Sequence, residues 1–134
     1  MVGLVTEFVL RALPEEFAVC RLAADAPRPT WAKGTFISVT RTPSELSVVC
    51  DRDAVPSDVR AERDWRALVL TGEHDLALAG LLKQLLDPLA GAGVPVFVVS
   101  TFDTDYVLVR RFDTAVTALE DAGFEVLGAS VGLD

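Results

Sequence analysis

Two carboxylates stand two residues apart in the stretch STFDTDYVLV, which runs from Ser100 to Val109 between two apolar segments. Apolar segments joined by so few residues predict the two antiparallel strands of a hairpin, with the aspartates at its turn. Asp103 is equally well explained by an Asx turn, in which its carboxylate accepts hydrogen bonds from nearby backbone amides. Two roles remain open for Asp105: contact with a ligand, or a staple across the hairpin.

A second group of candidate residues, Gly72-Glu73-His74-Asp75, follows an apolar run and precedes a segment with helical periodicity. The free backbone amides at a helix start, with the positive end of the helix dipole, suit a carboxylate ligand. Gly72 would let the backbone approach closely, and Asp75 is the expected N-cap. Each residue also has a simpler explanation, since a turn alone accounts for Gly72 and solvent exposure for His74.

The chain does not have the pattern of an enzyme. Ser100, His74 and Asp75 are the residue types of a hydrolase triad, but no nucleophile-elbow motif surrounds the serine. There is no phosphate-binding loop and no paired-cysteine metal motif, and His74 is the only histidine. The sequence therefore predicts no catalytic residues, no cofactor and no metal. Cys20 and Cys50 lie in apolar runs, which favours buried reduced thiols over a disulfide.

Composition and charge narrow the choice of partners. The 134 residues are 51% hydrophobic, enough for one compact domain or two small ones, and disorder is not expected. The net charge of −8 argues against nucleic acid and favours cationic or zwitterionic small molecules. No apolar run approaches the roughly 20 residues needed to span a bilayer, and the N-terminus lacks a basic leader. We therefore expect a cytoplasmic protein without membrane contact.

The second half of the chain predicts alternating strands and helices. A leucine stripe at Leu78, Leu82, Leu85 and Leu89 indicates an amphipathic helix, which Pro88 should end or kink. A later helix should start at an N-cap on Asp113 and end with Gly123 at its C′ position. Around these helices the expected strands are 65–71, 94–100, 106–109 and 124–127. The order strand, helix, strand, strand, helix, strand is the ferredoxin-like βαββαβ arrangement.

The first half of the chain repeats part of the strand pattern of the second half. Strands are expected at 17–22, 35–40 and 46–50, with a turn at RTPSE, where Thr42 and Glu45 have capping-box spacing. The charged segment that follows predicts a short helix at SDVRAE, residues 57–62. The sequence thus divides into a partial N-terminal unit, residues 1–64, and a complete C-terminal unit, residues 65–134.

These patterns resemble a known family. The segments TPSELSVVCD and TGEHDLALAGLLKQLLDPLAGAGVPVFVVSTFDTDYVLV, with AGFEV near the end, are similar to the ACT domains of the tandem, CASTOR-like subgroup. The resemblance covers about residues 17–126, and the STFDTDYVLV hairpin is its most specific element. It implies an α+β fold: two tandem ACT-like units of the ferredoxin-like type, with antiparallel sheets and helices on one face.

The resemblance also implies a function and a site. ACT domains typically bind amino acids between paired domains, so it implies a regulatory, allosteric module that binds an amino acid or similar small zwitterion and forms a homodimer. A ligand-free structural or dimerisation adaptor with the same fold is the alternative. The implied ligand-binding residues are Gly72, His74, Asp75, Leu76, Val96 (or Pro95), Thr101, Phe102 and Asp105. Unlike the arginine-sensing members, the chain has no acidic residue from Leu76 to Ala79.

Overall fold

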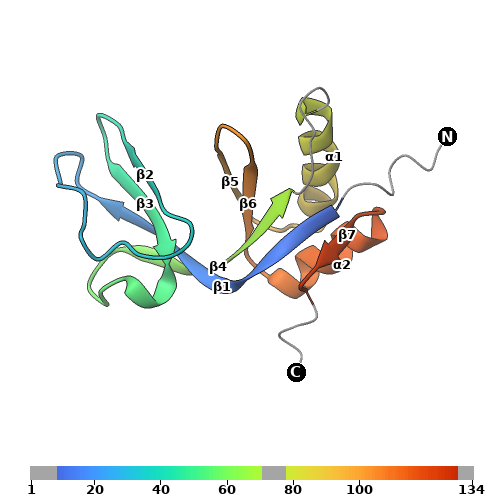
Figure 1. Cartoon of the computed structure of the whole chain (residues 1–134), viewed down its shortest axis with the longest axis horizontal. Coiled ribbons are helices and arrows are strands. Elements are labelled where there is room, and N and C mark those ends of the chain that lie inside the picture. Colours follow the sequence, from blue (N-terminus) through green and yellow to red (C-terminus); the bar gives the residue numbers. More distant parts are fainter. Residues whose placement is uncertain (1–8, 71–77, 130–134) are drawn as a thin grey trace. The chain divides into compact units, whose positions relative to one another are not determined.

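The computed structural model describes residues 9–70 and 78–129, which form a mixed α/β fold (Figure 1). Seven strands, two α-helices and one 3₁₀ helix lie within these ranges. In chain order they are β1 (Val9–Leu22), β2 (Ser38–Arg41), β3 (Leu46–Asp51), η2 (Arg52–Ala54), β4 (Ala61–Leu70), α1 (Leu78–Gly91), β5 (Val96–Ser100), β6 (Asp105–Val109), α2 (Phe112–Asp121) and β7 (Glu125–Leu127).

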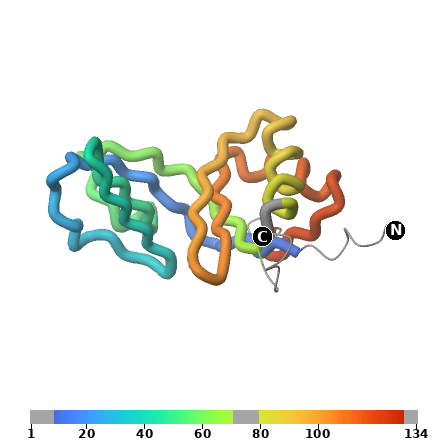
Figure 2. Tube along the Cα trace, turned by 90° about the horizontal axis from the view of Figure 1, so that it is seen from above, coloured from blue at the N-terminus to red at the C-terminus, as the bar shows by residue number. Residues whose placement is uncertain are grey.

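The chain divides into two compact units. Unit 1 combines Met1–Pro14 with Arg66–Asp134, and unit 2 is Glu15–Trp65. The long strands β1 and β4 contribute residues to both units, as the tube in Figure 2 lets the reader follow. This division differs from the expected one at the N-terminus. Residues 9–14 belong with the C-terminal unit because Val9, Leu10 and Arg11 pair with residues 125–127 of β7.

Unit 1 has the expected βαββαβ order, given by β4, α1, β5, β6, α2 and β7. Its strands lie in the order β7-β1-β4-β6-β5, so the start of β1 is inserted between β7 and β4. The pairs β4–β6 and β5–β6 are antiparallel, whereas β1–β7 is parallel. The ferredoxin-like ACT fold is confirmed, with one added strand.

The core of unit 1 lies between the two helices and one face of its sheet. Successive strand residues point to opposite faces, and alternate residues at the ends of β4 (Leu68, Leu70) and β6 (Val107, Val109) join the same buried cluster as the helices. The buried members are Leu10, Ala12, Leu68, Leu70, Leu81, Leu85, Leu89, Val94, Val107, Val109, Ala115, Leu119, Phe124 and Val126. Of the expected leucine stripe, Leu85 and Leu89 are buried and Leu82 is partly buried, and Leu81 is a further buried residue of the helix. The side chain of Leu78 lies outside the described part of the chain.

Helix boundaries deviate from the sequence expectations in two places. Helix α1 continues through Pro88 to Gly91, so the proline lies within its last turn rather than ending it. Helix α2 has Arg111 as its N-cap, in the left-handed region at φ 55°, and Asp113 lies in the first turn. The predicted Asp113 N-cap is therefore wrong by two positions. Gly123 follows the C-cap Ala122 with φ 100°, which confirms its predicted C′ position.

Unit 2 contains strands and η2 but no α-helix, which fits a partial copy of the fold. Its strand order is β2-β3-β1-β4, with antiparallel β1–β3 and β2–β3 pairs. The helix predicted at residues 57–62 is wrong, because β4 already begins at Ala61. The preceding loop is held instead by Arg63, whose guanidinium donates to the carbonyls of Val55, Pro56 and Val59.

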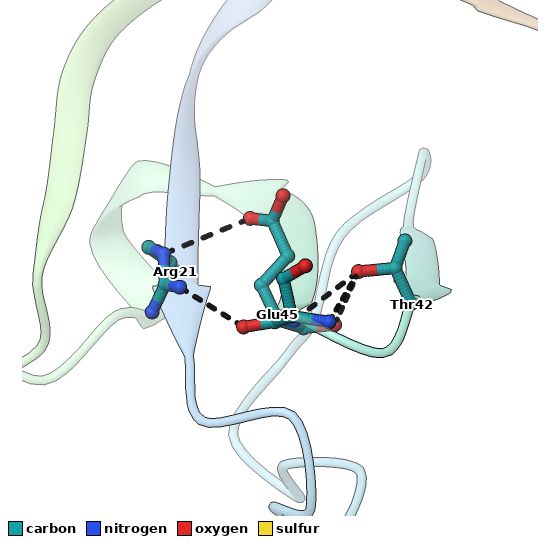
Figure 3. Close-up of polar contacts among 4 residues, drawn as sticks. Arg21, Thr42 and Glu45 are labelled. Atoms are coloured by element: carbon teal, nitrogen blue, oxygen red, sulfur yellow. Dashed lines mark hydrogen bonds and ion pairs between the residues drawn. The ribbon is translucent and has the colours of Figure 1, made fainter.

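The RTPSE turn joins β2 to β3 as expected. The Thr42 hydroxyl accepts hydrogen bonds from the backbone amides of Ser44 and Glu45, each at 3.1 Å (Figure 3). From β1, the Arg21 guanidinium donates to the Ser44 carbonyl at 3.0 Å and lies 3.9 Å from the Glu45 carboxylate. The threonine and glutamate therefore stabilise a β-turn, although their spacing is also that of a helix-capping box.

Candidate functional site

The β5–β6 hairpin contains four of the eight candidate residues. The Thr101 amide donates to the Thr104 carbonyl at 2.7 Å, and the Thr101 hydroxyl donates to the same carbonyl at 3.0 Å and accepts from the Thr104 amide. These bonds close a loop whose central residues are Phe102 and Asp103. The tip of the hairpin is therefore held by threonine.

Asp105 forms the cross-strand pair next to this loop. It is opposite Ser100 in the register, and the serine hydroxyl donates to its Oδ1 at 2.5 Å. The residue is only 3% exposed, and among the described residues it is the only charged one that is buried. A carboxylate can accept about four hydrogen bonds, so one serine leaves it able to accept more. The hairpin staple that the sequence suggested is present.

Asp105 also lies at a defined end of the sheet. Its side chain shares a face with Val107 and Val109, both members of the helix-side core. Since Val69 pairs with Tyr106, continuing the register places Asp105 opposite Leu70, the last residue of β4. The segment that follows Leu70 in sequence carries the candidates Gly72, His74, Asp75 and Leu76, which lie outside the described residues.

The other hairpin candidates occupy different environments. Phe102 is fully exposed, with a relative exposure of 103%, so it neither lines a core nor fills a cavity in unit 1. Thr101 is exposed, and its hydroxyl is used in the turn. Val96 is partly buried against the unit 1 core at the start of β5, about 13 Å along the strand from Ser100. Asp105 and Val96 therefore do not belong to one site within a single hairpin.

A groove along α2 was not foreseen from the sequence. It has a volume of about 420 Å³ and is lined by Ala92, Asp113, Thr114, Thr117, Ala118 and Asp121. The signal that could have found it is the acidic end of α2, where Glu120 and Asp121 occupy the last turn without a basic residue. Its chemistry is hydroxyl and carboxylate at a helix surface.

Three ionisable groups of unit 2 have raised pKa values, and loss of contact with water is the largest cause for each. Burial, with a smaller effect of the neighbouring Cys50 thiol, raises the pKa of Cys20 from 9.0 to about 11. Burial likewise raises the pKa of Cys50, and both cysteines are free thiols inside the unit, as predicted. The pKa of Asp51 is also raised, by burial and then by the nearby carboxylates of Glu15 and Asp53. A thiol with a raised pKa is a poor nucleophile at neutral pH.

No helix in residues 9–70 and 78–129 is long and apolar enough to cross a membrane. Within the same part of the chain, no three His, Cys, Asp or Glu side chains are grouped so that they could hold a metal ion.

Comparisons with known families match both halves of the chain. The ACT domain family matches residues 60–121, and a family described as an N-terminal domain matches residues 15–58. Among curated proteins, the human cytosolic arginine sensor for mTORC1 subunit 1 is 31% identical over 99 residues, which are 66% of this chain and 30% of the sensor. Human CASTOR3P is 30% identical over 91 residues, 58% of this chain and 56% of that protein. The chain thus spans only part of each curated relative.

Solved structures give a fuller match in length. A crystal structure of a protein from Agobacterium tumefaciens has a TM-score of 0.84 at 36% identity and covers 90% of this chain and 92% of its own. The ligand-free regulatory subunit of aspartate kinase from Thermus thermophilus has a TM-score of 0.56 at 11% identity. The match covers 81% of this chain and 93% of the subunit, and at this identity it shows the fold alone. With its βαββαβ unit and its sequence relatives, the chain belongs to the ACT domain proteins of the CASTOR-like group.

Proposed function

We propose that this protein is a regulatory module that binds an amino acid or similar small zwitterion at the end of the unit 1 sheet where β4 ends and β6 begins. The observation that carries the proposal is the buried carboxylate of Asp105, which within residues 9–70 and 78–129 is paired with the Ser100 hydroxyl alone. Burying a charged carboxylate costs several kcal/mol unless it is well paired, and a ligand ammonium would supply a strong, charge-assisted partner.

The ligand class follows from charge and from the relatives. An ammonium or guanidinium is attracted to Asp105, and the chain's net charge of −8 disfavours anions in general. The name of the human relative identifies it as an arginine sensor, which supports an amino acid here. The absence of an acidic residue from Leu76 to Ala79 leaves the ligand side chain open. In this proposal Gly72, His74, Asp75 and Leu76 contact the ligand from the β4–α1 connection, and Thr101 and Phe102 from the hairpin.

The proposal includes a homodimer formed through β5, the last strand in the order. The bonds from the Arg110 amide to the Pro95 carbonyl and from Thr101 to Thr104 fix the alternation of the β5–β6 ladder. Odd-numbered β5 residues turn their backbone groups toward β6, so those of Val96, Val98 and Ser100 face the open edge. Because the backbone of Pro95 faces β6, its missing N–H takes no hydrogen-bond donor from the open edge.

The side chains of β5 also favour pairing. The strand is VFVVS, without a charge, whereas natural edge strands are usually protected by charged residues or proline. The edge strand of unit 2, β2, ends in Arg41, which donates to the carbonyls of Ala24 and Ala26. An antiparallel β5–β5 contact about a twofold axis would satisfy the outward groups and bring Val96 of one protomer near the hairpin of the other.

Regulation would follow from linkage. A ligand held between two protomers stabilises the arrangement that it bridges, by its difference in affinity for the two arrangements. Coupling energies of about 1–3 kcal/mol are usual for such systems. The protein therefore needs no catalytic group, and its output is a change in subunit arrangement.

Isothermal titration calorimetry of the full chain against the twenty amino acids tests the ligand. We expect at least one to bind in the micromolar to millimolar range, and Asp105→Asn to weaken it at least tenfold. Asp103→Asn is the matched control, because it removes the same charge two residues away at an exposed site. If no amino acid binds at millimolar concentration, the ligand proposal is wrong.

The dimer is tested separately by analytical ultracentrifugation. Val98→Pro removes an amide that faces the open edge, so the variant should keep its circular dichroism spectrum and sediment as a monomer. Val98→Ala keeps the amide and should remain a dimer. A dimeric Val98→Pro variant would exclude the β5 interface.

The alternative, a ligand-free adaptor, makes the opposite prediction for the ligand. It requires that Asp105 serve only as a staple for Ser100, with dimerisation retained. Unchanged thermal stability in the presence of every amino acid, together with a dimer that depends on Val98, would favour it.

A further inference from the structure

We propose that Glu15 and Asp51 in unit 2 share one proton, and that loss of this proton releases residues 33–35 from the strand pair β1–β3. This role is separate from the ligand site and the dimer of unit 1. Two carboxyl oxygens, Oε1 of Glu15 and Oδ1 of Asp51, are buried and have no hydrogen-bond partner within residues 9–70 and 78–129. An ionised carboxylate only accepts hydrogen bonds, so two such oxygens cannot satisfy one another without a proton.

Both carboxyl groups lie against the same short segment. The Thr35 hydroxyl donates to Oε2 of Glu15 at 2.9 Å. A Cβ built on Gly34 would lie 2.9 Å from both Cγ and Oδ1 of Asp51, so this carboxyl group contacts the glycine backbone. Phe17 pairs with Asp51 in the β1–β3 register, and Glu15, two residues earlier, shares that face and is diagonal to Asp51. The two carboxyl groups are therefore neighbours over residues 34–35.

The surrounding charges do not compensate the pair. The Arg52 guanidinium is bound to the carboxylates of Glu16 and Asp53. In the described part of the chain the Lys33 ammonium makes no ion pair, and from β4 the Arg63 guanidinium donates to backbone carbonyls of the preceding loop. Two ionised carboxylates in these surroundings would repel one another at close range, which a single shared proton prevents.

One proton satisfies both oxygens. With the proton on Asp51, its hydroxyl donates to Oε1 of Glu15, and the pair carries one negative charge rather than two. Burial, followed by the nearby carboxylates of Glu15 and Asp53, raises the pKa of Asp51, which is the direction that this arrangement requires. The neighbouring Cys50 thiol adds no charge at neutral pH, because burial raises its pKa above 9.0. A hydrogen bond from a hydroxyl to a carboxylate is among the stronger ones in proteins.

The shared proton makes the contact with residues 33–35 sensitive to pH. The pKa of Asp51 is higher in the closed arrangement than after release, so closure is fully favoured below the pKa of released Asp51 and weakens as the pH rises through that of the closed pair. Between these two values, release should become up to about tenfold more frequent for each pH unit. Residues 33–35 lie in the connection between β1 and β2, so deprotonation frees that connection while the β1–β3 ladder remains.

Nuclear magnetic resonance of the full 134-residue chain can follow both the proton and the release. We expect the carboxyl carbon of Asp51 to titrate at a higher pH than an aspartate in a short blocked peptide of the same local sequence. The Asp51 amide donates to the Lys33 carbonyl, so its protection against hydrogen exchange should fall by up to about tenfold for each pH unit over the same range. The Thr42 amide, which donates to the Glu45 carbonyl in the β2–β3 turn, should keep its protection. Titration of Asp51 as in the peptide, or equal losses at the two amides, would overturn the proposal.

Glu15→Gln separates a shared proton from the effect of burial alone. The variant removes the second carboxylate, so the Asp51 titration should move toward that of the peptide and the loss of amide protection should disappear. Asp53→Asn is the matched control, because it removes the other carboxylate that acts on Asp51, from a side chain that is 90% exposed, and it should move the titration less. Equal movements in the two variants, or an unmoved titration in Glu15→Gln, would exclude the shared proton.

Asp51→Asn provides a second test that does not depend on the folding of Glu15→Gln. The asparagine amide can donate to Glu15 without taking up a proton. The protection of the amide at position 51 should therefore become independent of pH, relative to that of Thr42. A pH dependence that persists in Asp51→Asn would show that another group controls the release of residues 33–35 and would contradict the proposal.

Discussion

Replacing Asp105 with asparagine should separate its contribution to stability from its contribution to binding. The carboxylate is 97% buried, and taking such a group out of water costs several kcal/mol. The hydrogen bond from Ser100 returns about 1.5–3 kcal/mol, since bonds to charged groups are the stronger ones. An asparagine carbonyl would keep that bond at about 0.5–1.5 kcal/mol without the cost of burying a charge. We therefore expect Asp105→Asn to lower the free energy of unfolding by less than about 1 kcal/mol, or to raise it.

Ser100→Ala should behave differently. It leaves a buried carboxylate oxygen without its donor, which costs about 1–3 kcal/mol, and the loss should be smaller in the Asp105→Asn background. Urea unfolding followed by far-ultraviolet circular dichroism measures all four proteins of this cycle. The reasoning fails if Asp105→Asn destabilises the protein by more than about 2 kcal/mol while amino-acid binding is unchanged, because Asp105 would then be a structural staple only.

Three further predictions concern groups with defined surroundings. Since the pKa of Cys20 is raised from 9.0 to about 11, its contribution to the free energy of unfolding is fully present below pH 9, and up to about 3 kcal/mol is lost between pH 9 and 11. Urea unfolding measures this fall, which should be smaller in Cys20→Ala, where only the buried Cys50 thiol with its raised pKa remains. The raised pKa of Asp51 means that its ionised form is disfavoured in the folded protein. Asp51→Asn should therefore raise the melting temperature at pH 7, and the difference from the unchanged protein should vanish once acid protonates Asp51. The Arg66 guanidinium lies 4.0 Å from the centre of the Phe112 ring and makes two hydrogen bonds to the Leu13 carbonyl. Lysine cannot make both contacts, so Arg66→Lys should lower the free energy of unfolding, measured in urea, by about 1–2 kcal/mol.

The elements that the sequence predicted well are those determined by local patterns. The β5–β6 hairpin, both helices and the Gly123 C′ position follow from hydrophobic periodicity and turn chemistry within a few residues. The errors were of three kinds. Most boundaries moved by one to four residues, as at the α2 N-cap and at the start of β4. The charged run after β3 proved to be a loop held by Arg63 rather than a helix, and β1 begins eight residues before its expected start.

The extent of β1 could not be predicted because its pairing is non-local. Residues 9–11 pair with residues 125–127, more than a hundred positions away, and only that contact places them in unit 1. Locally, Pro14 and two glutamates argue against a strand at this point. Asp105 was identified from its position in the hairpin alone, but its burial depends on the packing of unit 1 and had no local signal.

The two units use their polar side chains in different ways. In unit 2 the arginines at positions 21, 41 and 63 donate to backbone carbonyls and hold loops in place. In unit 1 three features are unfavourable for an isolated domain: a buried aspartate, an uncharged edge strand β5, and carboxylates at the end of α2. Unit 2 has one comparable feature, since Glu15 and Asp51 each bury an oxygen without a hydrogen-bond partner. The buried aspartate and the uncharged edge strand are the two features of unit 1 on which the proposed ligand site and dimer rest. Since Glu15 and Asp51 show that unit 2 also holds unfavourable polar groups, such a feature marks a site only together with its geometry, as at the end of the unit 1 sheet.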